Sequence, residues 1–119
     1  MDSKTNNKTQ DTIIISSQYG RKEIGKQKII YCRSFSVGTL VYLKDGSHLL
    51  LKESIHVLKS YLQESEFFLV DEYHLINIRY IDAIFSNRIL LVNGGKCNIE
   101  AKRRKELFTR IEHFYAMQY

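Results

Sequence analysis

The densest cluster of charged side chains is the basic run Lys102-Arg103-Arg104-Lys105. Arginine is its informative member, because a planar guanidinium can donate two parallel hydrogen bonds to a phosphate or to guanine, whereas lysine acts as a point charge. The plainer interpretation is a solvated helix surface, since both residue types favour helices and need no partner. A looser basic set, which can extend a phosphate-binding face, consists of Arg21, Lys22, Lys26 and Lys28.

The residues that usually carry catalysis or bind metals form no recognisable pattern. The histidines show neither HExxH nor the close paired spacing of a metal site; they are His48, His56, His74 and His113. Neither GxSxG nor a phosphate-binding loop occurs, and adjacent acids such as Asp71-Glu72 are more often solvated or capping groups than an acid/base pair. We therefore expect no enzymatic activity, no metal and no cofactor.

Length and charge narrow the class of protein further. The chain has 119 residues, which suits one domain, and its net charge of +5 favours an anionic partner. Cys32 and Cys97 form no CxxC motif, so neither a disulfide framework nor a zinc module is indicated. No apolar run approaches the ~18 residues of a membrane helix. We expect a cytoplasmic protein without a membrane partner.

The elements that must position these residues are mostly strands. Residues 1–11 are polar after the first methionine and predict a disordered tail, which leaves 12–119 as the domain. Short apolar runs of strand size follow at Thr12–Ser16, which could be buried on both faces, and at Ile29–Arg33, Phe67–Val70, Ala83–Ser86, Ile89–Val92 and Lys96–Ala101. Between the first two runs, Ser17–Lys28 is expected to form a solvated hairpin or loop.

Turns and helical spacing complete the predicted architecture. Asp45-Gly46 between Gly38–Lys44 and Ser47–Lys52 predicts a hairpin, and Asn93-Gly94-Gly95 predicts another turn. The spacing of apolar residues predicts a helix over Ser54–Gln63 with Ser54 as N-cap. A closing helix presents Leu107, Ile111, Phe114 and Tyr115. The predicted fold class is mainly β, with compact antiparallel sheets in hairpins and two short α-helices.

Three stretches in this order resemble the LytTR DNA-binding domain, which is found at the C-terminus of many bacterial response regulators and occasionally stands alone. Ile29–Lys52 is similar to the family's strand, exposed loop and strand-turn-strand. Phe68–Ile81 (FLVDEYHLINIRYI) is similar to its most characteristic block, a polar turn followed by an aliphatic–Asn–aliphatic step. Ala101–Phe108 (AKRRKELF) looks like its closing segment. The likeness spans about 12–114.

The resemblance implies an all-β fold whose loops enter successive major grooves, with no long recognition helix. It also implies DNA contacts from three places: the loop after the second strand, the polar turn, and the terminal basic segment. The residues at these places are Arg33, Ser34 and Ser36 in the loop, Glu72, Tyr73 and His74 in the turn, and Lys102, Arg103, Arg104 and Lys105 at the end. Arg103 fits the family's terminal arginine.

Some residues in the matched blocks are expected to be structural. An amide inside an apolar segment usually bonds to backbone, so Asn77 is predicted to fix a turn and not to contact DNA. The aromatic residues Phe67, Phe68, Tyr80 and Phe85 fit core positions before any base-stacking role, which makes single-stranded binding a minor option.

Two functions remain open from the sequence. The first is a sequence-specific transcriptional regulator that binds double-stranded DNA, with a second protomer on repeated half-sites and a separate signalling protein as further partners. The second is a LytTR-like protein-interaction module that has lost DNA binding, because Asp71 and Glu72 place carboxylates where the family favours His, Arg or Asn. Such carboxylates would face phosphates, at a cost of ~1–3 kcal/mol per repulsive or lost contact.

Overall fold

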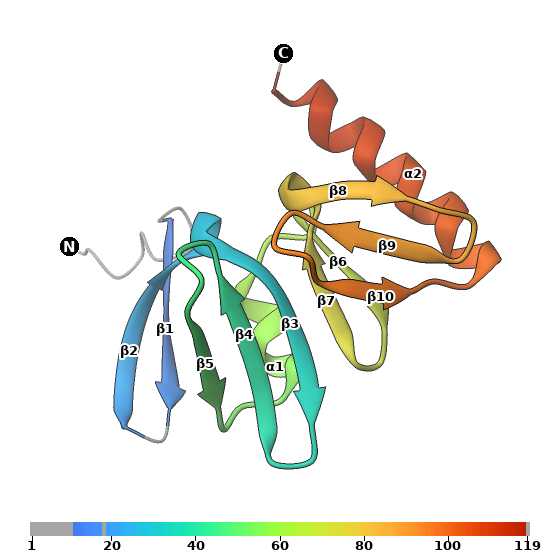
Figure 1. Cartoon of the computed structure of the whole chain (residues 1–119). Coiled ribbons are helices and arrows are strands. Elements are labelled where there is room, and N and C mark those ends of the chain that lie inside the picture. The colour runs from blue at the N-terminus through green and yellow to red at the C-terminus, as the bar shows by residue number, and fades with distance from the viewer. Residues whose placement is uncertain (1–10, 18, 119) are drawn as a thin grey trace.

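The computed structural model describes residues 11–17 and 19–118 (Figure 1). The disordered tail predicted for residues 1–11 lies outside the described residues, apart from Asp11. The Asp11 carbonyl accepts a hydrogen bond from the Lys26 amide at 2.6 Å.

The described chain folds into antiparallel sheets with two α-helices, as the sequence predicted. One sheet has seven strands in the order β2-β1-β5-β4-β3-β7-β6, and a smaller one has the order β10-β9-β8. The strands are β1 (Thr12–Ser17), β2 (Gly20–Gly25), β3 (Ile29–Phe35), β4 (Gly38–Leu43), β5 (His48–Leu51), β6 (Phe67–Asp71), β7 (His74–Asn77), β8 (Ile81–Ile84), β9 (Arg88–Leu91) and β10 (Lys96–Asn98). The helices are α1 (Ile55–Tyr61) and α2 (Ala101–Ala116).

Two hairpin turns share the same interactions: a side-chain oxygen accepts from the amide two residues later, and a glycine takes a positive φ. Between β4 and β5 the Asp45 carboxylate accepts from the Ser47 amide at 2.9 Å, and Gly46 takes a φ of +93°. Between β9 and β10 the Asn93 side chain accepts from the Gly95 amide at 3.0 Å, and Gly94 takes a φ of +87°. Glycine suits these positions because it lacks the Cβ that penalises positive φ. Both predicted turns are confirmed.

Helix α1 begins where the sequence predicted. The Ser54 hydroxyl accepts a hydrogen bond from the Val57 amide at 3.2 Å, so it satisfies one of the free amides of the first turn. Ile55 and Leu58 are buried against the large sheet. The helix covers one face of that sheet (Figure 1).

Three strands of the large sheet are shared by two hydrophobic cores. One core lies between that sheet and α1, and the other between the sheet, the small sheet and α2. In β6, Phe67 packs in the first core and Phe68 in the second, and in β7 Leu75 and Ile76 divide in the same way. In β3, Ile29 belongs to the first core and Ile30 to the second. Burial on both faces explains why these strands are continuous apolar runs.

The structure corrects several expectations about individual elements. Strand β1 is buried on one face, because Ile14 points outward with 55% exposure. For Ser17–Lys28 the sequence left a hairpin or a loop open, and the structure has the hairpin, because β2 pairs with β1 along its whole length. Phe85, predicted as a core residue, is 45% exposed, and so is Tyr115 of the predicted face of the closing helix.

Candidate nucleic-acid interface

The structure brings the loop between β3 and β4 beside the turn between β6 and β7. Arg33 of β3 lies opposite His74 of β7 in the antiparallel register. The Ser34 amide then donates a hydrogen bond to the Tyr73 carbonyl at 2.8 Å. Two of the three segments predicted to contact DNA are therefore joined through their backbones.

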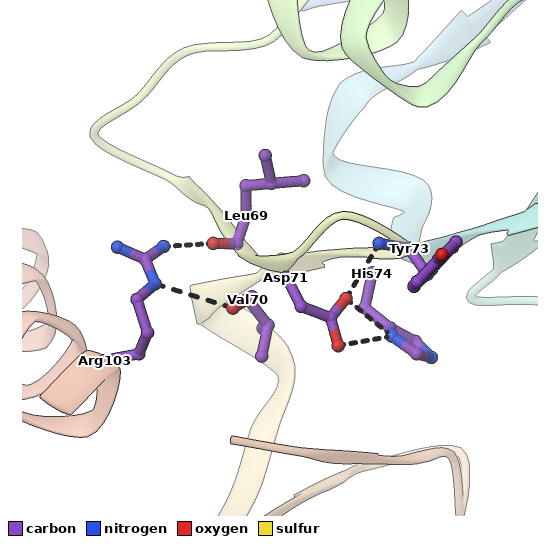
Figure 2. Close-up of polar contacts among 6 residues, drawn as sticks. All are labelled: Leu69, Val70, Asp71, Tyr73, His74 and Arg103. Atoms are coloured by element: carbon purple, nitrogen blue, oxygen red, sulfur yellow. Dashed lines mark hydrogen bonds and ion pairs between the residues drawn. The ribbon is translucent and has the colours of Figure 1, made fainter. Parts of the chain in front are cut away.

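The turn between β6 and β7 is organised by the Asp71 carboxylate (Figure 2). One carboxylate oxygen accepts from the Tyr73 amide at 2.8 Å and lies 3.0 Å from the His74 Nδ1. Asp71 therefore satisfies groups of its own turn. Glu72 is exposed and, within the described chain, forms no ion pair. Of the two carboxylates, Glu72 is the one free to meet a partner.

Arg103 links the start of α2 to the strand that leads into this turn (Figure 2). Its guanidinium donates to the Leu69 carbonyl and, at 3.5 Å, to the Val70 carbonyl, and it pairs with Glu106. The guanidinium carbon also lies 4.5 Å from the centre of the Phe68 ring. The hydrogen-bond donors of Arg103 are thus used within the protein. The sequence could not indicate this, because Leu69 and Val70 are far from Arg103 in the chain.

Of the other residues of the basic run, Lys102 and Lys105 are three positions apart and share one face of α2, whereas Arg104 lies on another. Successive residues of an α-helix are ~100° apart, so four consecutive side chains cannot share one face. Lys102 and Lys105 are exposed, and Arg104 is half-buried. Lys102 and Lys105 therefore offer the most accessible charge at this end of α2.

A groove separates the turn from the start of α2. It has a volume of about 740 Å³, and its polar lining residues are Asp71, Glu72, Asn87, Asn98, Glu100 and Arg103. The lining includes three carboxylates beside one guanidinium. The groove wall is therefore mainly acidic. The exposed Lys102 and Lys105 lie within a few residues of Glu100 and Arg103, which line it.

The first predicted segment is exposed at its tip. Arg33 and Ser36 are exposed, and Ser34 is half-buried. The Arg33 guanidinium lies 5.0 Å from the centre of the Phe35 ring, an arrangement that holds both side chains at the surface. Phe35 and Val37 at the same tip were not among the predicted contact residues, although apolar residues in a hairpin turn were a signal that could have found them.

The looser basic set lies elsewhere. Arg21 and Lys22 are exposed on β2, the edge strand at the opposite end of the large sheet from β6. Lys26 is only 7% exposed. This set does not continue the surface formed by the three segments.

Asn77 has the structural role that the sequence predicted. Its side chain is fully buried, its Nδ2 donates to the Ile29 carbonyl at 2.9 Å, and its Oδ1 accepts from the Arg79 amide at 3.0 Å. The amide therefore ties the end of β7 to the start of β3.

Comparison with known proteins identifies the family. The sequence model of the LytTr DNA-binding domain matches residues 19–112. The chain belongs to the LytTR family. Among solved structures, the LytTR chain is similar to a LytTr DNA-binding domain from a Bacillus cereus protein described as a methyl-accepting/DNA response regulator. The TM-score is 0.70 at 15% identity, covering 86% of this chain and 97% of that one. No curated protein sequence matches the chain.

The LytTR family, to which this chain belongs, is a family of DNA-binding domains and not an enzyme family. Within residues 11–17 and 19–118, no three histidine, cysteine, aspartate or glutamate side chains are grouped so that they could hold a metal ion. None of the helices in the described part of the chain is both long and apolar enough to span a membrane.

Proposed function

We propose that the protein is a sequence-specific transcriptional regulator that binds double-stranded DNA through its loops and the start of α2. The observation that carries the proposal is the continuity of the three segments. The Ser34–Tyr73 hydrogen bond joins the first to the second, and the contacts of Arg103 with Leu69 and Val70 join the second to the third. Such a continuous edge can follow successive major grooves on one side of a duplex.

Each side chain has a role that fits its chemistry. Lys102, Arg104 and Lys105 contact phosphates, and Arg33 can pair with phosphate or guanine. Ser34, Ser36, Tyr73 and His74 supply polar contacts from the two tips. The Glu72 carboxylate lies in the same turn, where its negative charge opposes the phosphates of the duplex. Arg103, as bound in this structure, orients the turn and the helix start.

We also propose two protein partners: a second protomer and a signalling protein. Two protomers occupy repeated half-sites, and a separate signalling protein regulates binding in the cytoplasm. The number of protomers on each duplex can be measured by analytical ultracentrifugation of the complex.

A selection experiment tests this function. The purified chain is titrated against a pool of random duplexes at several salt concentrations, and the retained DNA is sequenced. An enriched repeat with a steep salt dependence is expected, because each neutralised phosphate lowers the slope of log affinity against log salt by ~0.9. Weak binding without enrichment, lost at physiological salt, would refute the proposal.

A pair of neighbouring variants separates DNA contact from structural support. Lys102→Ala is expected to reduce the salt slope by ~1 with little change in stability, because the side chain is exposed. Arg103→Ala is expected to lower the free energy of unfolding by ~1–3 kcal/mol, because it leaves two carbonyls and Glu106 without their donor. Urea unfolding and binding titrations are measured on both variants. Equal stability of the two would contradict the supporting role of Arg103.

The acidic groove beside the turn favours a second candidate function, a module that binds another protein. Glu72→Arg discriminates between them, whereas Asp71→His would also break the turn that Asp71 holds. If the turn faces DNA, Glu72→Arg should strengthen binding, and Glu112→Arg should not, although both change the charge equally. An interaction module would show no gain specific to Glu72→Arg.

A further inference from the structure

Three exposed apolar side chains stand at the tips of the two joined segments. Val37 is 70% exposed, Tyr73 is 58% exposed and Phe35 is 42% exposed. Val37 occupies a turn between β3 and β4, where Gly, Asn, Asp and Ser are the usual residues and a β-branched side chain has no local advantage. We call Phe35, Val37 and Tyr73 the apolar tip.

The apolar tip combines residues from two distant parts of the chain. The hydrogen bond from the Ser34 amide to the Tyr73 carbonyl joins Tyr73 to Ser34, which directly precedes Phe35 in the chain. Single exposed apolar residues are common on protein surfaces and need no explanation. Three at adjoining tips, flanked by the Arg33 guanidinium, form a surface that loses contact with water only when a partner covers it.

We infer that the apolar tip contacts the C5-methyl groups of thymines in the major groove, with Val37 as a specificity-determining residue. This inference rests on the proposed function. Thymine carries the only methyl group among the four base edges in that groove, and apolar side chains recognise it by van der Waals contact. Arg33, whose guanidinium stacks near Phe35, supplies the positive charge that an anionic duplex requires at the same place.

The probe is the duplex enriched in the selection, with thymines replaced one at a time by uracil. Uracil pairs identically but lacks the methyl group, so only contacts to that methyl are removed. The wild-type chain is expected to bind at least one uracil duplex about fourfold more weakly, the amount expected for one buried methyl group. Affinities are measured by fluorescence anisotropy at one salt concentration.

The ratio of thymine to uracil affinity is then measured for variants. Val37→Ser should bring the ratio to about one at that position, while Val37→Thr, which keeps one methyl and the same shape, should retain most of it. Val92→Ser is the matched control: Val92 is 54% exposed in the turn between β9 and β10, whose Gly95 packs on Tyr31 near the start of β3, the strand end opposite the tip. Tyr73→Ser tests the second segment in the same way.

The outcomes separate the two proposals. If a sequence is enriched but wild type binds every uracil duplex as well as the thymine duplex, the inference is wrong and the regulator proposal stands. If neither Val37→Ser nor Tyr73→Ser changes the ratio, the inference is also wrong. A pool without enrichment overturns the regulator proposal and the inference together. The uracil comparison on wild type needs no variant, so a variant that fails to fold does not prevent the test.

Discussion

Asn77 joins distant parts of the backbone with one buried amide. Both ends of the side chain are used, one by the Ile29 carbonyl and the other by the Arg79 amide. Sequence alone predicted that this residue bonds to backbone, because an amide in an apolar segment needs partners. It could not predict that one partner lies in β3, since that pairing depends on the tertiary fold.

Asn77→Ala is expected to lower the free energy of unfolding by ~2–4 kcal/mol, because a buried carbonyl and a partly buried amide lose their partners. Asn93→Ala is the control, since Asn93 is exposed and makes one turn hydrogen bond, and it should cost less than ~1 kcal/mol. Both are measured by urea unfolding. Similar losses would contradict the structural importance assigned to Asn77.

Gly95 is required by space. A Cβ there would lie 2.6 Å from the Tyr31 Cε1, and the Tyr31 ring is held by stacking on Tyr42 at 4.5 Å. Gly95→Ala should therefore destabilise the protein by ~1–3 kcal/mol. Gly25→Ala should be neutral or stabilise by up to ~1 kcal/mol, because its φ is −68° and its Cβ would meet Lys28 at 3.6 Å. Thermal melting of both variants checks this contrast.

Among the elements, those with local signals were predictable. The Asp45-Gly46 hairpin and the helix capped by Ser54 depend on residues within a few positions of one another, and both were predicted. Strand β7 was missed because its four residues are stabilised by pairing with β3 and β6. The charged segment that contains strand β2 was predicted to be a hairpin or a loop, and only the structure shows the pairing with β1 that makes it a hairpin. The three segments proposed to contact DNA were located by family resemblance, and their contact with one another through Ser34 and Arg103 required the structure.

The β1–β2 hairpin is attached weakly to the rest of its sheet. In the part of the chain that the structure describes, Ser17 opposite Leu51 is the sole register pair between β1 and β5. We expect native-state hydrogen exchange to report a lower opening free energy for amides paired between β1 and β2 than for those between β3 and β4. Equal opening free energies in both hairpins would show that the buried Ile13, Ile15 and Ile24 side chains hold the hairpin as firmly as strand pairing would.

For the whole molecule, two buried thiols and one buried phenol cause the free energy of unfolding to fall at alkaline pH. Burial raises the pKa of Cys32 from 9.0 to about 12. Burial and then Asp71 raise the pKa of Cys97 to about 12. Burial and then Tyr42 raise the pKa of Tyr31 from 10.0 to about 12. In the unfolded chain these groups lose their protons at lower pH, so their contribution to stability is complete below about pH 9 and declines towards about pH 12.

The urea midpoint should therefore fall between about pH 8 and about pH 11. Cys32→Ala should show a smaller fall, whatever its stability at neutral pH, because the most deeply buried thiol is gone. If the urea midpoint of this variant falls as much as that of wild type, other groups cause the loss of stability at alkaline pH.

The strands shared by the two cores also determine how much sequence variation the molecule tolerates. In β6 and β7, successive residues face different cores. Odd-numbered and even-numbered positions of these strands are therefore both buried. In β1, by contrast, Ile14 faces solvent between Ile13 and Ile15. A library of all single substitutions, selected for folded protein, should thus accept polar residues at alternate positions of β1 but at none of Phe67, Phe68, Leu75 and Ile76. Lineages of this protein can then diversify on the solvent-facing side of β1 and in the loops, while β6 and β7 stay fixed.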